Sequence, residues 1–172
     1  SLGVNLGGVN YDHETASAIL TEYGFPISDL EAKISSSYSK NKESSTSLSG
    51  GQRQMLALLR VEYQLRISEK NRETASQHWT EYQQRGSQTG RETAKLQSEI
   101  RNAEKVDIRT IIIDEPTNDL DSKSKETAIN LVEKWMNDPK RTVVLVSHDP
   151  DVQKIIDGHN ARKIVLEKGK IV

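Results

Sequence analysis

The chain has 172 residues, about the length of one domain or one domain with an appendage, and 34% of them are hydrophobic. Its 24 basic and 25 acidic side chains give a net charge of −1, which is no argument for nucleic acid or an anionic membrane as a partner, and the absence of cysteine excludes disulfides and thiol catalysis. No apolar run approaches the roughly 20 residues that span a bilayer, and no signal pattern is present, so we expect a soluble chain.

The first third of the chain predicts short helices. Apolar residues at helical spacing predict a helix near residues 13–23, with Asp12 as its N-cap and Gly24 at its end. A second short helix is expected shortly afterwards, where Ser28 and Glu31 form a capping-box pattern.

A long polar stretch then follows a third helix. This helix should begin at Ser49, after a serine-rich loop over 35–47, and continue past Leu59. From Glu62 to Lys105 there are eight Lys or Arg, seven Asp or Glu and few apolar residues. Two apolar stripes at helical spacing favour a helical hairpin with a narrow apolar seam, formed by Ala75, Trp79, Tyr82, Leu96, Ile100 and Ala103. A disordered insertion is the alternative.

The last third has a regular α/β pattern. Thr110–Asp114 and Thr142–Ser147 are β-branched runs of the kind buried in a parallel sheet. Asp121 can cap the helix between them, and Asp149 can cap the helix that follows. A small hairpin over 163–172 should close the chain. This order of elements predicts the closing half of a doubly wound layer.

The segment Ser49-Gly50-Gly51-Gln52 is typical of a helix start that binds an anion. Ser49 as N-cap and Gln52 at the third helical position can satisfy each other's backbone N–H groups. The two glycines leave the backbone bare, so an anion can approach the positive end of the helix dipole. Taken alone, the pattern also fits an ordinary capped helix after a flexible loop.

Acidic residues and a histidine follow the two predicted strands. Asp114 and Glu115 come at the end of the first strand and His148 after the second, at the sheet edge where open α/β sheets bind ligands. Asp114 suits Mg²⁺, Glu115 could polarise an attacking water, and His148 could hydrogen-bond a phosphate. Taken alone, Asp114 and Glu115 also fit a solvated strand end, and His148 also fits an incidental histidine. The order of the motifs along one chain favours phosphoryl chemistry.

These motifs resemble those of the ATP-binding cassette (ABC) ATPases. Leu48–Gln52 resembles the family signature, and Ile111–Glu115 resembles the Walker B motif with its catalytic glutamate. Asn118–Asp121 is similar to the D-loop, and His148 to the switch histidine. The resemblance covers nearly everything except roughly residues 62–107 and is strongest for exporter cassettes.

The resemblance implies an α/β fold, a partial P-loop NTPase layer of parallel strands and helices with an α-helical subdomain and a helical hairpin insertion. Residues 1–61 would form the helical subdomain ending in the signature helix, and residues 62–107 the polar hairpin insertion. Residues 108–172 would form the C-terminal half of the ATPase core.

The resemblance also implies ATP and Mg²⁺ as cofactors, and a second cassette paired head to tail. Ser49, Gly50 and Gly51 would then contact the γ-phosphate of ATP held by the partner cassette, with Gln52 and Asp121 as further nucleotide-binding residues. Glu115 and His148 would act on the ATP of their own cassette, where Asp114 would hold the metal.

The chain departs from the family in having no recognisable phosphate-binding loop. Gly3 and Gly8 have the glycine spacing of that loop, but Val9 and Asn10 follow where Lys and Ser or Thr are required. We therefore expect the nucleotide-binding part of an ABC transporter, inactive alone, held in the cytoplasm at the inner membrane face by transmembrane partner segments. The alternatives are a soluble, non-transport ABC ATPase associated with ribosomes or nucleic acid, and a half cassette that acts as a partner-binding module.

Overall fold

The structure, a computed structural model, describes residues 1–26, 29–31, 48–85, 90–105, 107–159 and 161–171. Ser28, the expected start of a second short helix, and the loop expected over 35–47 lie outside these ranges. Among the residues that are described, no helix is both long enough and apolar enough to cross a bilayer.

Helix α2 (His13–Glu22) confirms the first predicted helix. Asp12 is its N-cap, and the Asp12 side chain accepts a hydrogen bond from the Thr15 amide at 2.8 Å. Gly24 follows the last turn with a φ of +60°, a backbone conformation that favours glycine. The residues that α2 buries in the core are Ala16, Ile19 and Leu20.

Helix α1 (Leu2–Gly7) was not predicted, because a helix of six residues offers too few apolar positions for a period to be recognised. Its Leu2 and Leu6 are buried in the core. A Cβ atom added at Gly3 would overlap the ring of Tyr11, so this glycine is explained by close packing. That role agrees with the rejection of a phosphate-binding loop at this position.

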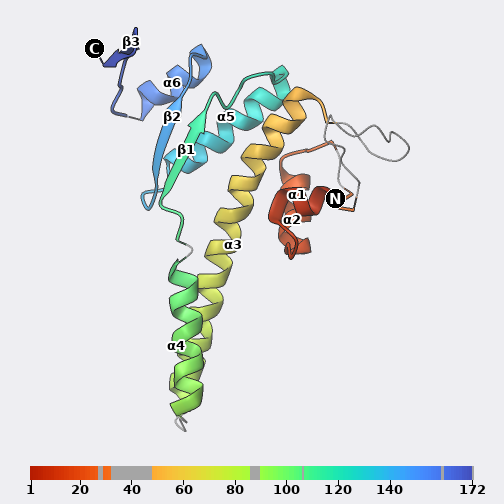
Figure 1. Cartoon of the computed structure of the whole chain (residues 1–172), viewed down its shortest axis with the longest axis vertical. Helices are drawn as coiled ribbons and strands as arrows, with labels where there is room; N and C mark the ends of the chain where they lie inside the picture. Colours follow the sequence, from red (N-terminus) through yellow and green to blue (C-terminus); the bar gives the residue numbers. More distant parts are fainter. Residues whose placement is uncertain (27–28, 32–47, 86–89, 106, 160, 172) are drawn as a thin grey trace.

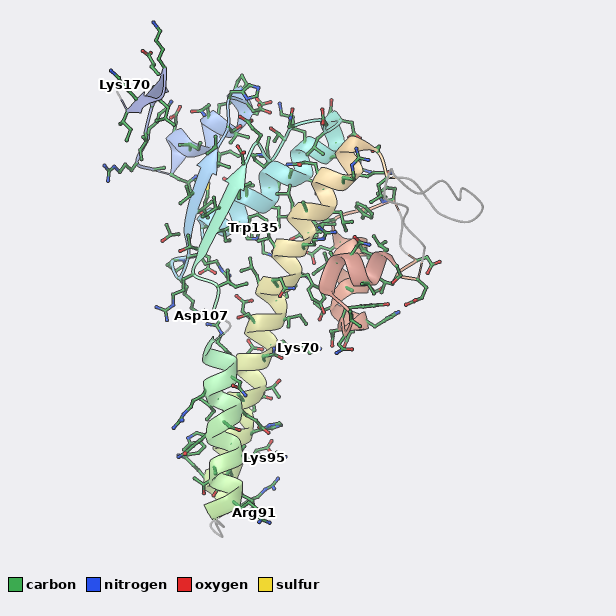
Figure 2. All side chains as sticks on the ribbon, viewed as in Figure 1. Lys70, Arg91, Lys95, Asp107, Trp135 and Lys170 are labelled. Atoms are coloured by element: carbon green, nitrogen blue, oxygen red, sulfur yellow. The ribbon has the colours of Figure 1, made fainter. Side chains whose placement is uncertain are left out.

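One uninterrupted helix, α3 (Gly50–Arg85), runs from the signature segment to the far end of the molecule (Figure 1). Its first half packs against α1 and α2, and its second half packs against the returning helix α4 (Gly90–Lys105). Ala75, Tyr82 and Ala103 are buried where α3 and α4 meet, whereas Arg91 and Lys95 on α4 are exposed (Figure 2). Nothing in α3 marks a boundary at residue 61, so the division of the chain there remains a proposal.

Strands β1 (Thr110–Asp114) and β2 (Thr142–Val146) form a parallel pair in which Asp114 is opposite Val146. The expectation that both strands are buried is wrong for one face of the pair. Ile112 is 75% exposed, and Val144 and Val146 are 47% and 54% exposed. Helix α5 (Ser122–Met136) packs against the strand pair, while no element in the described part of the chain covers the opposite face.

The remaining elements follow the predicted order. Asp121 caps α5, and Asp149 caps α6 (Pro150–Gly158), each through its side chain. The closing hairpin is shorter than expected, with β3 (Leu166–Glu167) and β4 (Lys170–Ile171) pairing antiparallel. The mixture of helices with a parallel strand pair fits part of a P-loop layer.

Candidate functional site

The C-terminal ends of β1 and β2 bring Glu115 and His148 together. Nδ1 of His148 lies 2.8 Å from Oε1 of Glu115, and the Ser147 hydroxyl lies 3.4 Å from the other carboxylate oxygen. The two strands are parallel and in register, so the residues that follow them must be neighbours. This is the arrangement that the order of the motifs predicts.

The Glu115–His148 pair perturbs the titration of both side chains. The hydrogen bond from His148 lowers the pKa of Glu115, and the same bond and the carboxylate charge raise the pKa of His148. The His148 side chain is 85% exposed, whereas that of Glu115 is only 28% exposed. The carboxylate is therefore ionised at neutral pH, and the imidazole keeps an open side toward solvent.

The backbone of Glu115 has an unusual conformation. Its φ is +46°, in the left-handed region that residues with a side chain rarely adopt. Its amide donates to the Val146 carbonyl at 2.8 Å, and its own carbonyl accepts from the Gln54 side chain at 3.0 Å and from the Asn118 amide at 3.2 Å. Sequence reasoning missed Gln54, because its partner lies 61 positions away along the chain.

A second set of contacts joins the two loops that carry Glu115 and His148. The Thr117 hydroxyl donates to Asp149 at 2.7 Å, and Nζ of Lys125 lies 2.9 Å from Asp149 and 2.8 Å from Asp151. Burial tends to raise the pKa of Asp149, but the hydrogen bonds from Thr117 and Lys125 outweigh it and bring the pKa to about 2. The small cavity here, about 220 Å³, is lined by Glu115, Thr117, Asn118, Lys125, His148, Asp149 and Pro150.

Asp114 does not line this cavity. It is exposed, and it alternates with the buried Ile113 so that it shares the open face of β1 with Ile112. Mg²⁺ usually keeps several waters and is bound through one or two carboxylates and the phosphates of its substrate. A single exposed carboxylate at a strand end fits that mode of binding, and the described residues contain no cluster of three potential metal ligands.

The signature segment forms the reciprocal cap that its sequence predicts. The Ser49 amide donates to the Gln52 side chain at 2.9 Å, and the Gln52 amide donates to the Ser49 hydroxyl at 3.1 Å. The first amides of an α-helix have no acceptor within the helix, so the start of α3 is suited to bind an anion.

The two glycines of the signature segment differ in their surroundings. A Cβ atom added at Gly51 would lie only 2.6 Å from the backbone carbonyl oxygen of Asp119, so the close approach of this backbone requires a glycine there. A Cβ atom added at Gly50 would lie 3.6 Å from the nearest atoms of the Asp119 side chain, which is ordinary van der Waals contact. Packing within the chain therefore explains Gly51 but leaves Gly50 without a packing reason.

The signature segment borders a cavity of its own, about 430 Å³ in volume. Asp121 lines this cavity, and its side chain also accepts from the Ser124 amide at 2.8 Å as the N-cap of α5. The other lining residues are Tyr23, Gly24, Phe25, Pro26, Ser49, Gly51, Gln52, Met55, Asp119, Lys123, Ser124 and Thr127. No residue lines both this cavity and the one beside Glu115, so the chain presents two separate surfaces for ligands.

A capped glycine helix start, a carboxylate–histidine pair at the ends of parallel strands, and a loop between them that touches both resemble the arrangement of motifs in ABC ATPases. Known proteins agree with this assignment. The chain is 37% identical over 67 residues to the energy-coupling factor transporter ATP-binding protein EcfA2 of Staphylococcus epidermidis, and 45% identical over 62 residues to that of Thermotoga maritima. It is 37% identical over 62 residues to the lipoprotein-releasing system ATP-binding protein LolD of Leptospira interrogans.

Over these stretches the chain is similar to ATP-binding proteins of ABC transporters, which supports an ABC ATPase fragment. They span 36% to 39% of this chain and only 22% to 24% of the relatives' own length. No protein-family model matches the chain, and no solved structure matches it significantly.

Proposed function

We propose that the chain is the signature- and Walker B-bearing part of the ATP-hydrolysing unit of an ABC transporter. The observation that carries this proposal is the 2.8 Å pairing of Glu115 with His148 at adjacent parallel strand ends, in a relative of ABC transporter ATP-binding proteins. In this proposal residues 1–61 form the helical subdomain, 62–107 the hairpin insertion and 108–172 the C-terminal half of the core.

Each side chain of the pair has a role that suits its surroundings. The ionised carboxylate of Glu115 orients and polarises the attacking water, because phosphoryl transfer depends mainly on positioning and charge stabilisation. The exposed imidazole of His148 hydrogen-bonds a phosphate oxygen on its solvent side. Asp114 holds Mg²⁺ from the end of β1; Mg-ATP supplies the phosphoryl group and the neutralising charge.

The separation of the two cavities supports pairing with a second cassette. Ser49 and Gly50 at the start of α3 contact the terminal phosphate of ATP carried by that cassette, and Asp121 lines the cavity that Ser49 also lines. Glu115 and His148 act on ATP bound by their own cassette. The transmembrane partner of such a unit holds the chain at the cytoplasmic face of the membrane.

The first test uses the 172-residue chain alone. We expect weak binding of Mg-ATP and no hydrolysis, because the sequence has no G-x-x-x-x-G-K-[ST] motif, which forms the loop that cradles the β-phosphate. Steady-state release of phosphate measures the activity. Robust turnover by the chain that is lost in Glu115→Gln would contradict the proposal that the chain alone is inactive.

The second test uses the assembly isolated from the source cell with its partners. We expect Mg-ATP hydrolysis that falls by roughly a hundredfold or more in Glu115→Gln, as for loss of a group that handles the water proton. Gly50→Ala should also reduce turnover although the fold has room for the methyl group, whereas Gly90→Ala, where a Cβ atom meets nothing within 4 Å, is the matched control. Full activity of Glu115→Gln would contradict the proposed function.

A further inference from the structure

The strained backbone of Glu115 is held from both sides. Its amide is fixed by the carbonyl of Val146 on β2, and its carbonyl is fixed by the side-chain amide of Gln54 on α3. A φ of +46° at a residue with a side chain persists only where the surroundings impose it. Among the described residues, the hydrogen bond from Gln54 is the one to the Glu115 backbone that comes from outside the strand ends and the loop.

Gln54 lies in the first turns of α3, two positions after the last residue of the signature segment. It is half-buried, and its Nε2 donates to the Glu115 carbonyl at 3.0 Å. One turn earlier on the same helix, Gly51 packs against the backbone of Asp119, at the other end of the loop that Glu115 begins. The start of α3 therefore touches both ends of this loop.

We propose that Gln54 is a positioning residue that sets the backbone of Glu115 and thereby links the signature segment to the candidate catalytic carboxylate of the same chain. The catalytic part of this inference rests on the proposed function. A shift of α3 that follows ligand contact at Ser49 then reaches Glu115 through one hydrogen bond. This gives one chain a direct connection between its two ligand surfaces.

The chemistry of the glutamine side chain matters to this role. Its NH₂ group donates to a carbonyl, which methionine of similar length cannot do and which a glutamate carboxylate would repel. Without Gln54, the Glu115 carbonyl keeps only the longer bond from the Asn118 amide. A net hydrogen bond of this type changes a local equilibrium by about threefold to tenfold.

Amide hydrogen exchange in the full chain without nucleotide tests the positioning role directly. We expect the Glu115 amide to exchange about threefold to tenfold faster in Gln54→Met than in the wild type. Gln64→Met, at an exposed position of the same helix, is the matched control and should leave the rate unchanged. Amides within α5, such as that of Leu131, should keep their protection. An unchanged Glu115 rate in Gln54→Met would overturn the inference.

A second variant separates hydrogen bonding from side-chain volume. Gln54→Lys restores a flexible donor, and we expect the exchange rate of the Glu115 amide to return to within about twofold of the wild type. If Gln54→Met also speeds exchange of the α5 amides through general unfolding, comparing the Glu115 exchange rate in Gln54→Lys with the wild-type rate still tests the role of the donor. If the Gln54→Lys chain is folded but its Glu115 amide still exchanges fast, a hydrogen-bond donor at position 54 does not set the Glu115 backbone, and the inference is overturned.

Turnover of the native assembly distinguishes this inference from the proposed function. We expect Gln54→Met to lower kcat about threefold to tenfold while KM for ATP stays within about twofold, because Gln54 lines neither cavity. An inactive wild-type assembly combined with faster Glu115 exchange would reject the function and keep the positioning role. Normal exchange and normal turnover in the variant would reject the positioning role alone.

Discussion

At the scale of single residues, the Glu115–His148 pair gives the site a pH dependence. The raised pKa of His148 means that the charged pair persists to higher pH than an ordinary histidine would allow, and it is lost as pH rises through that raised value. The lowered pKa of Glu115 means that the pair is lost at the acidic end only as pH falls through the lowered value. The ion pair therefore exists between these two limits.

We expect Glu115→Gln to lower the pKa of His148 toward its usual value, because the carboxylate is the main cause of the shift. A titration of the imidazole signals by nuclear magnetic resonance measures this. Glu126→Gln removes the same charge from an exposed position of α5 and should leave the pKa of His148 unchanged. An equal pKa in the wild type and in Glu115→Gln would mean that the two side chains do not pair in solution.

Sequence reasoning found the residues whose contacts are local or follow from strand pairing. The cap between Ser49 and Gln52 spans three positions, and the meeting of Glu115 with His148 follows once two strands are parallel. Gln54 was not predicted from the sequence, because its contact with Glu115 depends on how α3 packs across the strand ends. No periodic or local pattern contains that information.

At the scale of secondary-structure elements, a buried carboxylate joins three helices. Glu62 of α3 is 2% exposed, and its oxygens accept from Lys134 at 2.6 Å, from Arg66 at 2.7 Å and from the Trp135 indole at 2.9 Å. The Tyr23 hydroxyl at the end of α2 lies 3.4 Å away. Burial works to raise the pKa of Glu62, but hydrogen bonds led by those from Lys134 and Trp135 outweigh it and lower the pKa.

We expect Glu62→Ala to reduce the free energy of unfolding by about 3 kcal/mol, because it leaves the Trp135 indole without its partner and removes the charge that Arg66 and Lys134 share. Urea denaturation followed by circular dichroism measures the loss. Glu73→Ala, at an exposed position of the same helix, is the matched control and should change stability by less than about 0.5 kcal/mol. A loss below about 1 kcal/mol in Glu62→Ala would contradict a structural role for this junction.

The starts of α2, α5 and α6 were predictable because their caps are local. Asp12, Asp121 and Asp149 each accept from a backbone amide two or three positions later, as the residue types predict. The burial of β1 and β2 was less predictable. Their β-branched residues specify a strand, but exposure of Ile112 depends on which elements pack against each face of the sheet.

At the scale of the whole molecule, the strand pair leaves an apolar face in contact with water. Ile112, Val144 and Val146 are each about half exposed or more, and each strand pairs on one side only in the described part of the chain. Exposed apolar faces and free strand edges favour pairing with other chains.

We expect the isolated chain to associate with itself as its concentration rises, because burial of this face removes apolar surface from water. Sedimentation velocity over a range of concentrations measures the association. The double variant Ile112→Thr and Val144→Thr keeps strand-forming residues and should shift the chain toward monomer. Val9→Thr, at an apolar position that is 83% exposed away from the sheet, should not. Association that is equal in both variants would place the contact elsewhere.

Because α3 is long, a small tilt at one end of the helix moves its other end by a larger distance. Its 36 residues form a rod of about 54 Å at 1.5 Å per residue, with the signature segment at one end and Arg85 at the other (Figure 1). A tilt of about 5° about the signature end would displace the Arg85 end by about 5 Å for a rod of this length. Spectroscopic labels at Arg85 and on α6 would therefore turn small nucleotide-driven shifts near Gln54 into distance changes that fluorescence or electron-spin measurements can follow in real time.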